Sequence, residues 1–213
     1  NAYEVEAMQQ LLEEAGYEIV PFEPGADVYL INTCTVTNIA DRKSRQMLHK
    51  AKKMNPDAIV VATGCFVQTD EGKLDKDEAV DLILGNNQKG NIVQVLQEYE
   101  QQHTKQKHVL NINQTKEYEE LAINHTAEHV RAYIKVQDGC NQFCTYCIIP
   151  YARGRVRSRK IAQVMDEVRA LAAKGYKEVV LTGIHLSSYG VDFPEEERET
   201  LLSLIQSVHE VEG

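Results

Sequence analysis

Short apolar runs alternate with amphipathic helical patterns along the first hundred residues, and this alternation constrains the fold most. Runs with the composition of β-strands occupy residues 18–22, 27–32, 58–63 and 81–84. Apolar residues recur at helical spacing in residues 5–15, 38–54 and 92–99, and the first two patterns stop at Gly16 and at Asn55-Pro56. Because strands that alternate with helices pair in parallel, this half is predicted to be an open parallel α/β sheet covered by helices.

Two cysteines follow predicted strands at their carboxyl ends. Cys34 ends the run Asn32-Thr33-Cys34, and Cys65 ends the run Thr63-Gly64-Cys65. In open α/β sheets ligands gather outside the carboxyl ends of the strands, so both thiols are expected on the functional edge. A free cysteine at a strand end can also be a small buried apolar residue. The residues alone leave both interpretations open.

The second half of the chain has the opening pattern of a β/α barrel. From Arg131 onward the pattern predicts a strand, a cysteine loop, a helix over 161–171 capped by Ser158, a strand over 178–182 and a helix over 200–211. Residues 101–128 are polar and are interpreted as a linker with a short strand at 108–112. The predicted domains are therefore residues 1–100 and 129–213, joined by this linker.

The predicted barrel is short. A complete barrel needs about 200 residues or more, and the chain begins at a helix start with no strand before it. We therefore expect the chain to be a fragment whose barrel is truncated.

Three further cysteines lie in one loop, Gly139-Cys140-Asn141-Gln142-Phe143-Cys144-Thr145-Tyr146-Cys147. Thiolates spaced C-x3-C-x2-C can hold three irons of a cubane cluster and leave the fourth iron open to an external ligand. A zinc site of four cysteines is the alternative, but it usually needs two CxxC pairs and the chain has one. Five cysteines without an apolar signal segment argue against a disulfide framework and favour a reducing cytoplasm.

The formal charge of the chain is -9, so its surface as a whole is not expected to attract nucleic acid. Two segments are locally basic and supply candidate RNA contacts: Lys43 and Arg45, and after the cysteine loop Arg153, Arg155, Arg157 and Arg159. The alternatives are an ordinary solvated helix face for the first segment and a counter-charge to an anionic cluster for the second. No run approaches the roughly 20 apolar residues that cross a bilayer, so no membrane partner is expected.

Three stretches together resemble the methylthiotransferase family of radical S-adenosylmethionine enzymes. They are Asn32-Thr33-Cys34-Thr35-Val36-Thr37, Thr63-Gly64-Cys65, and the cysteine loop with its continuation Ile148-Ile149-Pro150-Tyr151-Ala152-Arg153-Gly154-Arg155. The resemblance implies two [4Fe-4S] clusters. Cys140, Cys144 and Cys147 would hold the first, whose open iron binds S-adenosylmethionine. Cys34 and Cys65 would hold the second, auxiliary cluster, together with a cysteine that the family carries upstream of Asn1.

The same resemblance suggests how the cofactor is held. Tyr146 would line its adenine site, or else pack under the loop. Thr182 and Gly183 would approach its methionine part, because glycine permits close backbone contact, or else form an ordinary turn. His185 is interpreted as a rim residue rather than a base.

The run from Cys34 to Gln46 is most similar to the branch of the family that methylthiolates N6-threonylcarbamoyladenosine 37 in tRNA. This similarity implies a tRNA anticodon stem-loop as substrate, an external electron donor and a cytoplasmic location. Branches acting on isopentenyladenosine or on a ribosomal protein are alternatives, and a noncatalytic iron–sulfur scaffold or electron carrier is an alternative of another class. The family's remaining barrel strands and carboxy-terminal RNA-binding module are absent, so this chain alone is expected to bind tRNA poorly and to be inactive.

Overall fold

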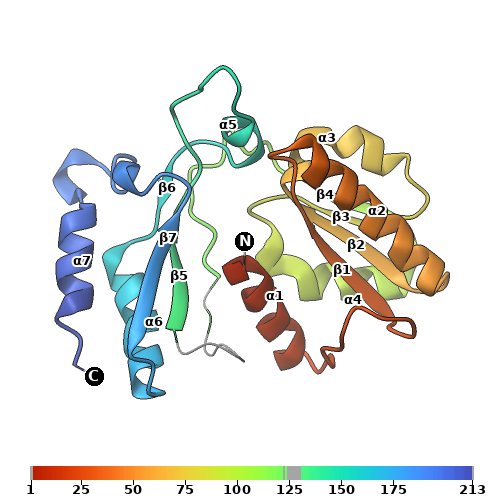
Figure 1. Cartoon of the computed structure of the whole chain (residues 1–213), viewed down its shortest axis with the longest axis horizontal. Coiled ribbons are helices and arrows are strands. Elements are labelled where there is room, and N and C mark those ends of the chain that lie inside the picture. Colours follow the sequence, from red (N-terminus) through yellow and green to blue (C-terminus); the bar gives the residue numbers. More distant parts are fainter. Residues whose placement is uncertain (1, 122, 124–130, 213) are drawn as a thin grey trace.

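The computed structural model shows two α/β halves side by side, the first on the right of Figure 1 and the second on the left. It describes residues 2–121, 123 and 131–212. Helix α1 (Ala2–Glu14) contacts α4 (Ile92–Gln102) of the first half and β5 (Arg131–Asp138) of the second. The amino-terminal helix therefore lies between the two halves and helps to fix their arrangement.

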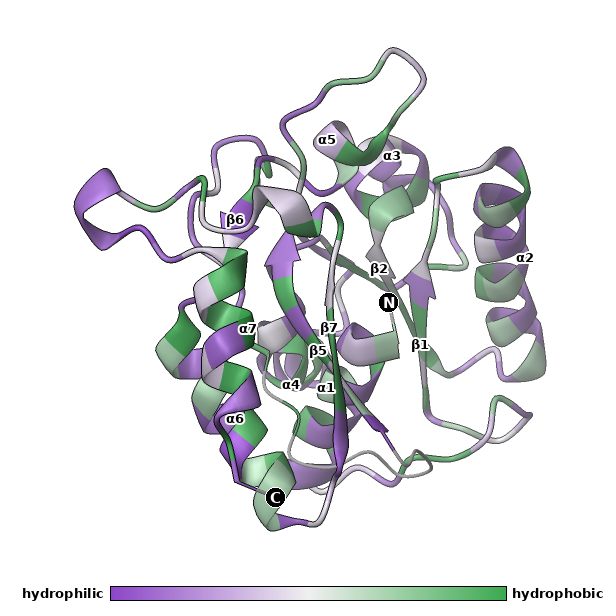
Figure 2. Cartoon of the chain, turned by 60° about the vertical axis from the view of Figure 1, so that its left-hand side comes forward, coloured by the Kyte–Doolittle hydropathy of each residue, from purple (hydrophilic) through white to green (hydrophobic). Residues whose placement is uncertain are grey.

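The first half is built on a parallel four-stranded sheet. Its strands pair in the order β1 (Val28–Thr33), β2 (Ile59–Gly64), β3 (Leu82–Leu84) and β4 (Gln106–His108). The covering helices are α1, α2 (Asn38–Met54), α3 (Cys65–Asp75) and α4 (Ile92–Gln102), the last preceded by the short helix η1 (Lys89–Asn91). In Figure 2, α2 shows hydrophobic and hydrophilic bands, as expected for a helix that buries one face.

Both faces of this sheet are covered. Val60, Ala62 and Ile83 pack with residues of α2 and α3 such as Leu48 and Phe66. On the opposite face Val61, Leu82 and Leu84 pack with Met8, Leu12, Ile92 and Leu96 of α1 and α4. Since consecutive residues of β2 point to opposite faces and both faces are buried, the run at 58–63 is almost continuously apolar.

The second half contains a three-stranded sheet in the order β6 (Arg157–Ser158), β5 (Arg131–Asp138) and β7 (Glu178–Gly183). Strands β5 and β7 are parallel, and β6 runs antiparallel to β5. Helices α6 (Ile161–Ala173) and α7 (Leu201–His209) cover one face, where Ala132, Ile134 and Val136 are buried. The short helices are α5 (Ile149–Ala152), η2 (Leu186–Ser188) and η3 (Glu195–Glu197). The order strand, loop, helix, strand confirms the predicted opening of a β/α barrel.

Two sequence-based expectations about elements are wrong. Residues 18–22 form no strand, and Ile19, Val20 and Phe22 are exposed; Pro21 lacks the N–H that a ladder requires. Ser158 does not cap α6 but lies in β6, where its hydroxyl donates to Asp192. The first N–H of α6, at Ile161, donates instead to the Glu199 carboxylate at 2.7 Å.

The segment predicted as a linker begins inside the first sheet. Strand β4 (Gln106–His108) pairs in parallel with β3. It begins two residues before the predicted strand at 108–112 and shares only His108 with that prediction. Residues 122 and 124–130 of that segment lie outside the described part of the chain. Helices α3 and α5 and strand β6 were not predicted. Within the residues that the structure describes, every helix is too short or too polar to span a bilayer.

Candidate functional site

The ends of β1 and β2 bring Cys34 and Cys65 to one edge of the first sheet. Thr33 lies opposite Gly64 in the parallel register, so the two cysteines follow neighbouring strand ends. Gly64 has a φ of 98°, and a Cβ there would lie 2.4 Å from the carbonyl oxygen of Thr33. Only glycine permits this approach. The expectation that both thiols lie at the carboxyl edge is confirmed.

Ser44 of α2 fixes the backbone of Cys34. The Cys34 N–H donates to the Ser44 hydroxyl oxygen at 3.0 Å, and that hydroxyl lies 3.2 Å from the Cys34 carbonyl oxygen. Beside them, both polar atoms of the Asn32 amide are buried and have no hydrogen-bond partner among the described residues. A buried amide in this state has capacity for a further donor and acceptor.

The loop that carries Cys140, Cys144 and Cys147 is folded against the segment that follows α5. The Cys140 N–H donates to the Gly154 carbonyl oxygen at 3.0 Å, and the Asn141 side chain accepts from the Val156 N–H at 3.1 Å. Gly139 has a φ of 74°, and a Cβ there would lie 1.9 Å from the Arg155 carbonyl oxygen. Arg155 stacks over the Phe143 ring at 4.2 Å. The loop is thus held at its base, while Cys144 is exposed and Cys140 and Cys147 are half-buried.

The two cysteine loops lie at the same end of the molecule, at the top of Figure 1. Helix α5, which follows Cys147, packs against α3, which begins at Cys65. Arg153 at the end of α5 is buried, and its Nε donates to the Cys65 sulfur at 3.2 Å. A side chain of the second half therefore contacts a cysteine of the first.

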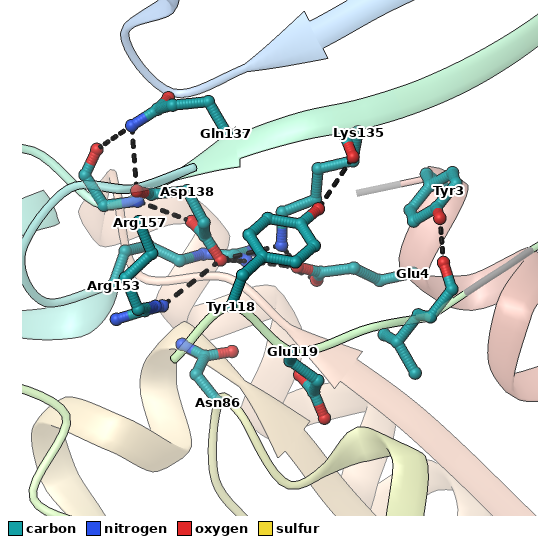
Figure 3. Close-up of polar contacts among 12 residues, drawn as sticks. Tyr3, Glu4, Asn86, Tyr118, Glu119, Lys135, Gln137, Asp138, Arg153 and Arg157 are labelled. Atoms are coloured by element: carbon teal, nitrogen blue, oxygen red, sulfur yellow. Dashed lines mark hydrogen bonds and ion pairs between the residues drawn. The ribbon is translucent and has the colours of Figure 1, made fainter. Parts of the chain in front are cut away.

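A buried network of charges surrounds Arg153 (Figure 3). Its guanidinium pairs with Glu4 of α1 and, at 3.4 Å, with Asp138 of β5. Lys135 of β5 contacts both carboxylates at 2.7 Å, and Lys89 lies 3.1 Å from Glu4. Burial alone would raise the pKa of Glu4 and Asp138, but the neighbouring lysine and arginine charges outweigh it and hold both pKa values below the usual range.

This network borders a small cavity between the two halves. The cavity has a volume of about 100 Å³ and is lined by Glu4, Lys135, Arg153, Thr182 and Gly183, among other residues. It is smaller than the roughly 300–1,000 Å³ typical of ligand pockets. A larger groove of about 900 Å³ lies over α6 and α7, but none of the five cysteines lines it.

Two segments of the chain match known families. Residues 1–85 match the family described as uncharacterized protein family UPF0004, and residues 134–210 match the radical SAM superfamily. Threonylcarbamoyladenosine tRNA methylthiotransferase MtaB is 45% identical in Aquifex aeolicus (strain VF5) and 43% identical in Bacillus subtilis (strain 168), each over the whole chain. The chain belongs to the radical S-adenosylmethionine methylthiotransferase family.

A relative with another name is similar to the chain at lower identity. A tRNA-2-methylthio-N(6)-dimethylallyladenosine synthase from Carboxydothermus hydrogenoformans is 33% identical over the whole chain. The chain spans about half the length of these curated relatives, with 51% of the Aquifex protein and 49% of the Carboxydothermus protein covered. A solved structure of the radical S-adenosylmethionine methyltransferase TsrM from Kitasatospora setae is similar to the chain, with a TM-score of 0.54 and 16% identity. The match covers 87% of this chain and 45% of the TsrM chain. At that identity the likeness shows the fold.

Membership of the radical S-adenosylmethionine superfamily implies a [4Fe-4S] cluster and S-adenosylmethionine. The thiols of Cys140, Cys144 and Cys147 fit such a cluster because they are unbridged, soft ligands in one short loop. No three His, Cys, Asp or Glu side chains of the described residues converge on a position for a single metal ion. In a cubane each thiolate binds its own iron, so the sulfurs do not need to share one centre.

The predicted cofactor-binding residues and His185 differ in how far they are buried. Thr182 and Gly183 line the small cavity, whereas Tyr146 is 91% exposed beside the cysteine loop. His185 is half-buried, and its ring nitrogens lie within hydrogen-bond distance of the Ser187 and Ser188 hydroxyls. These serines belong to the same loop, which is consistent with a residue at the rim.

The expectation of RNA contact is corrected for three arginines. Arg153, Arg157 and Arg159 are buried, because each is paired with a carboxylate in the interior. Arg155 is exposed, as are Lys43 and Arg45 on α2.

Sequence reasoning missed the members of the buried network, above all Glu4, Lys135 and Asp138. Glu4 lies four residues before Met8 on the buried stripe of α1, and Lys135 alternates with apolar residues along β5. A charged residue within a pattern that predicts burial indicates a buried ion pair, and this pattern could have identified Glu4 and Lys135 from the sequence.

Proposed function

We propose that the intact protein transfers a methylthio group to C2 of N6-threonylcarbamoyladenosine 37 in tRNA. The observation that carries this proposal is the meeting of two cysteine loops at one end of the fold, from two segments that match separate families. The choice of branch is supported by identities of 43–45% to MtaB proteins against 33% to a dimethylallyladenosine synthase.

In this proposal residues 129–213 contribute to the radical domain, and Cys140, Cys144 and Cys147 hold its cluster. When bound, the cluster and S-adenosylmethionine supply the radical that removes hydrogen from an aromatic carbon, which side chains cannot do. The contacts of Gly139 and Asn141 with residues 154–156 hold the loop so that Cys144 faces outward. Thr182 and Gly183 would receive the methionine part of the cofactor, and Tyr146 its adenine.

Residues 1–100, together with β4, form the second proposed unit. Cys34 and Cys65 would hold the auxiliary cluster that carries the sulfur, with a third cysteine supplied from upstream of Asn1. Ser44 holds the Cys34 backbone, and Arg153 contacts the Cys65 sulfur. The orphaned Asn32 amide at this edge supports the presence of a further group there.

The tRNA would meet the protein through its anticodon stem-loop. Arg155, Lys43 and Arg45 are the exposed basic residues that could contact its phosphates. An external donor would supply the electrons, and a tRNA substrate would be met in the cytoplasm.

The proposal is tested by mass spectrometry of tRNA from a deletion strain that carries the intact gene or a variant. Loss of the methylthio group in the deletion strain and its return with the intact gene are expected. Unchanged tRNA, with a methylthio group missing from a ribosomal protein instead, would reassign the substrate.

The division of labour is tested with the purified intact protein. Cys144→Ala should abolish formation of 5′-deoxyadenosine, whereas the neighbouring exposed Thr145→Ala should retain it. Cys34→Ala should spare this cleavage and stop methylthiolation. Cleavage that survives Cys144→Ala would exclude this assignment of the cluster. An intact protein that forms no 5′-deoxyadenosine at all would instead point to a noncatalytic iron–sulfur protein or electron carrier.

A further inference from the structure

Two nitrogen donors lie beside the Cys65 sulfur. Arg153 Nε donates to it at 3.2 Å, and the Asn86 amide nitrogen lies 4.0 Å away. Cys65, Arg153 and Asn86 are each exposed by no more than 2%. A charge-assisted hydrogen bond stabilises a negatively charged thiolate, and it does so more strongly at a buried position, where the local dielectric is low.

Both donors are held in place by other residues, and Figure 3 draws Arg153 beside Glu4. The Arg153 guanidinium pairs with Glu4 through both terminal nitrogens, the second at 3.2 Å. Asn86 donates to the Ala152 carbonyl oxygen at 2.6 Å and accepts from Lys89 at the same distance. The geometry at the sulfur is therefore set by residues of α1, η1 and the end of α5, and not by helix α3, which begins at Cys65, alone.

Arg153 also belongs to a buried network of ion pairs. The network joins Lys89, Lys135, Arg153 and Arg157 to Glu4 and Asp138. An anionic group at Cys65 would therefore lie in direct contact with a guanidinium that this network holds in place.

We propose that Arg153 is a positioning residue for the auxiliary cluster, which fixes the Cys65 sulfur and stabilises negative charge on it. This inference rests on the proposed function, in which Cys65 is a cluster ligand. Its consequence is that the second half of the chain sets the electronic properties of a cluster held by the first. A nearby positive charge and an N–H donor to a ligand sulfur favour the reduced cluster and raise its reduction potential.

The test uses the intact protein with Cys140→Ala, Cys144→Ala and Cys147→Ala, so that iron is bound only at the auxiliary site. After anaerobic reconstitution with iron and sulfide, the site is titrated with dithionite and followed by electron paramagnetic resonance. In this parent, Arg153→Met removes the donor and Arg153→Lys retains a charge. Arg159→Met is the matched control, because Arg159 is equally buried and paired with Glu120 and Glu167 but does not contact Cys65.

Arg153→Met should lower the ratio of reduced to oxidised cluster at the parent's midpoint by about tenfold, the effect of one charge-assisted hydrogen bond. Arg153→Lys should shift the ratio less, and Arg159→Met should leave it unchanged. Equal midpoints for Arg153→Met and Arg159→Met would overturn the inference while leaving the proposed function intact.

Iron content covers the case in which Arg153→Met fails to keep its cluster. Loss of iron from Arg153→Met but not from Arg159→Met, at similar thermal stability of the two apoproteins, supports the inference. Equal loss from both overturns it, because burial alone would then explain the effect. A parent that binds no iron overturns the auxiliary cluster itself, and with it both the second-cluster assignment and this inference.

Discussion

Replacing Glu4 with glutamine should destabilise the protein strongly at neutral pH. Glu4 is 1% exposed and forms ion pairs with Arg153, Lys135 and Lys89. Removing one partner of a buried ion pair costs about 3–5 kcal/mol. In the variant Lys135 and Arg153 still pair with Asp138, and Lys89 still donates to Asn86. We therefore expect a loss of about 3 kcal/mol in the free energy of unfolding, at the lower end of this range. In a chain of this length that corresponds to a fall of about 6–12 °C in the unfolding midpoint.

The same substitution should change the dependence of stability on pH. The neighbouring cations hold the folded-state pKa of Glu4 below its value of about 4.3 in an unfolded chain. A depressed carboxyl pKa contributes stability that is present above the unfolded value and is lost as the pH falls through the folded value. The difference between the natural chain and Glu4→Gln should therefore be full at pH 7 and shrink below about pH 4.

Thermal unfolding followed by circular dichroism between pH 7 and pH 3 measures both effects. Glu14→Gln is the control, because it makes the same chemical change at an exposed position of α1. If Glu4→Gln and Glu14→Gln unfold within about 2 °C of each other at pH 7, or if their difference widens toward pH 3, the reasoning about the buried network fails.

Three further outcomes are expected. Gly139→Ala should prevent iron binding by Cys140, Cys144 and Cys147, because the added Cβ would overlap the Arg155 carbonyl oxygen. Gly175→Ala is the control and should retain the iron, because a Cβ at Gly175 has no neighbouring atom within 4 Å. Iron analysis after reconstitution compares the two variants. Ser44→Ala should cost about 1 kcal/mol and lower iron occupancy at Cys34, because the Cys34 N–H loses its acceptor; unfolding and iron content report both. Leu48→Ala should cost about 2–5 kcal/mol in denaturant unfolding, against under about 0.5 kcal/mol for the exposed Ile39→Ala.

The sequence was sufficient to predict the elements whose pattern reflects local burial. Helix α2 begins and ends at the predicted residues, since Thr37 caps its first turn and Asn55 ends it. The placement of Cys34 and Cys65 followed from the topology of parallel sheets, because the carboxyl ends of paired strands share an edge.

The burial of the arginines could not be predicted from local pattern. Arg153 and Glu4 are 149 positions apart, and Arg157 and Arg159 stand in a run that reads as a basic loop. Such residues are buried only because carboxylates from other elements reach them. Likewise β6 is two residues long and is defined by its antiparallel partner β5, so its own sequence carries no period that would identify it.

The parallel register of β1 and β2 limits how this protein can change by insertion or deletion. Thr33 faces Gly64 across the ladder, and the side chains of a strand alternate between its two faces. One extra residue within β2 would turn the segment before Cys65 over and carry apolar residues from the core to the wrong side. Insertions and deletions should therefore be tolerated best in the turns at the opposite end of the sheet, such as residues 55–58, where they would displace neither thiol.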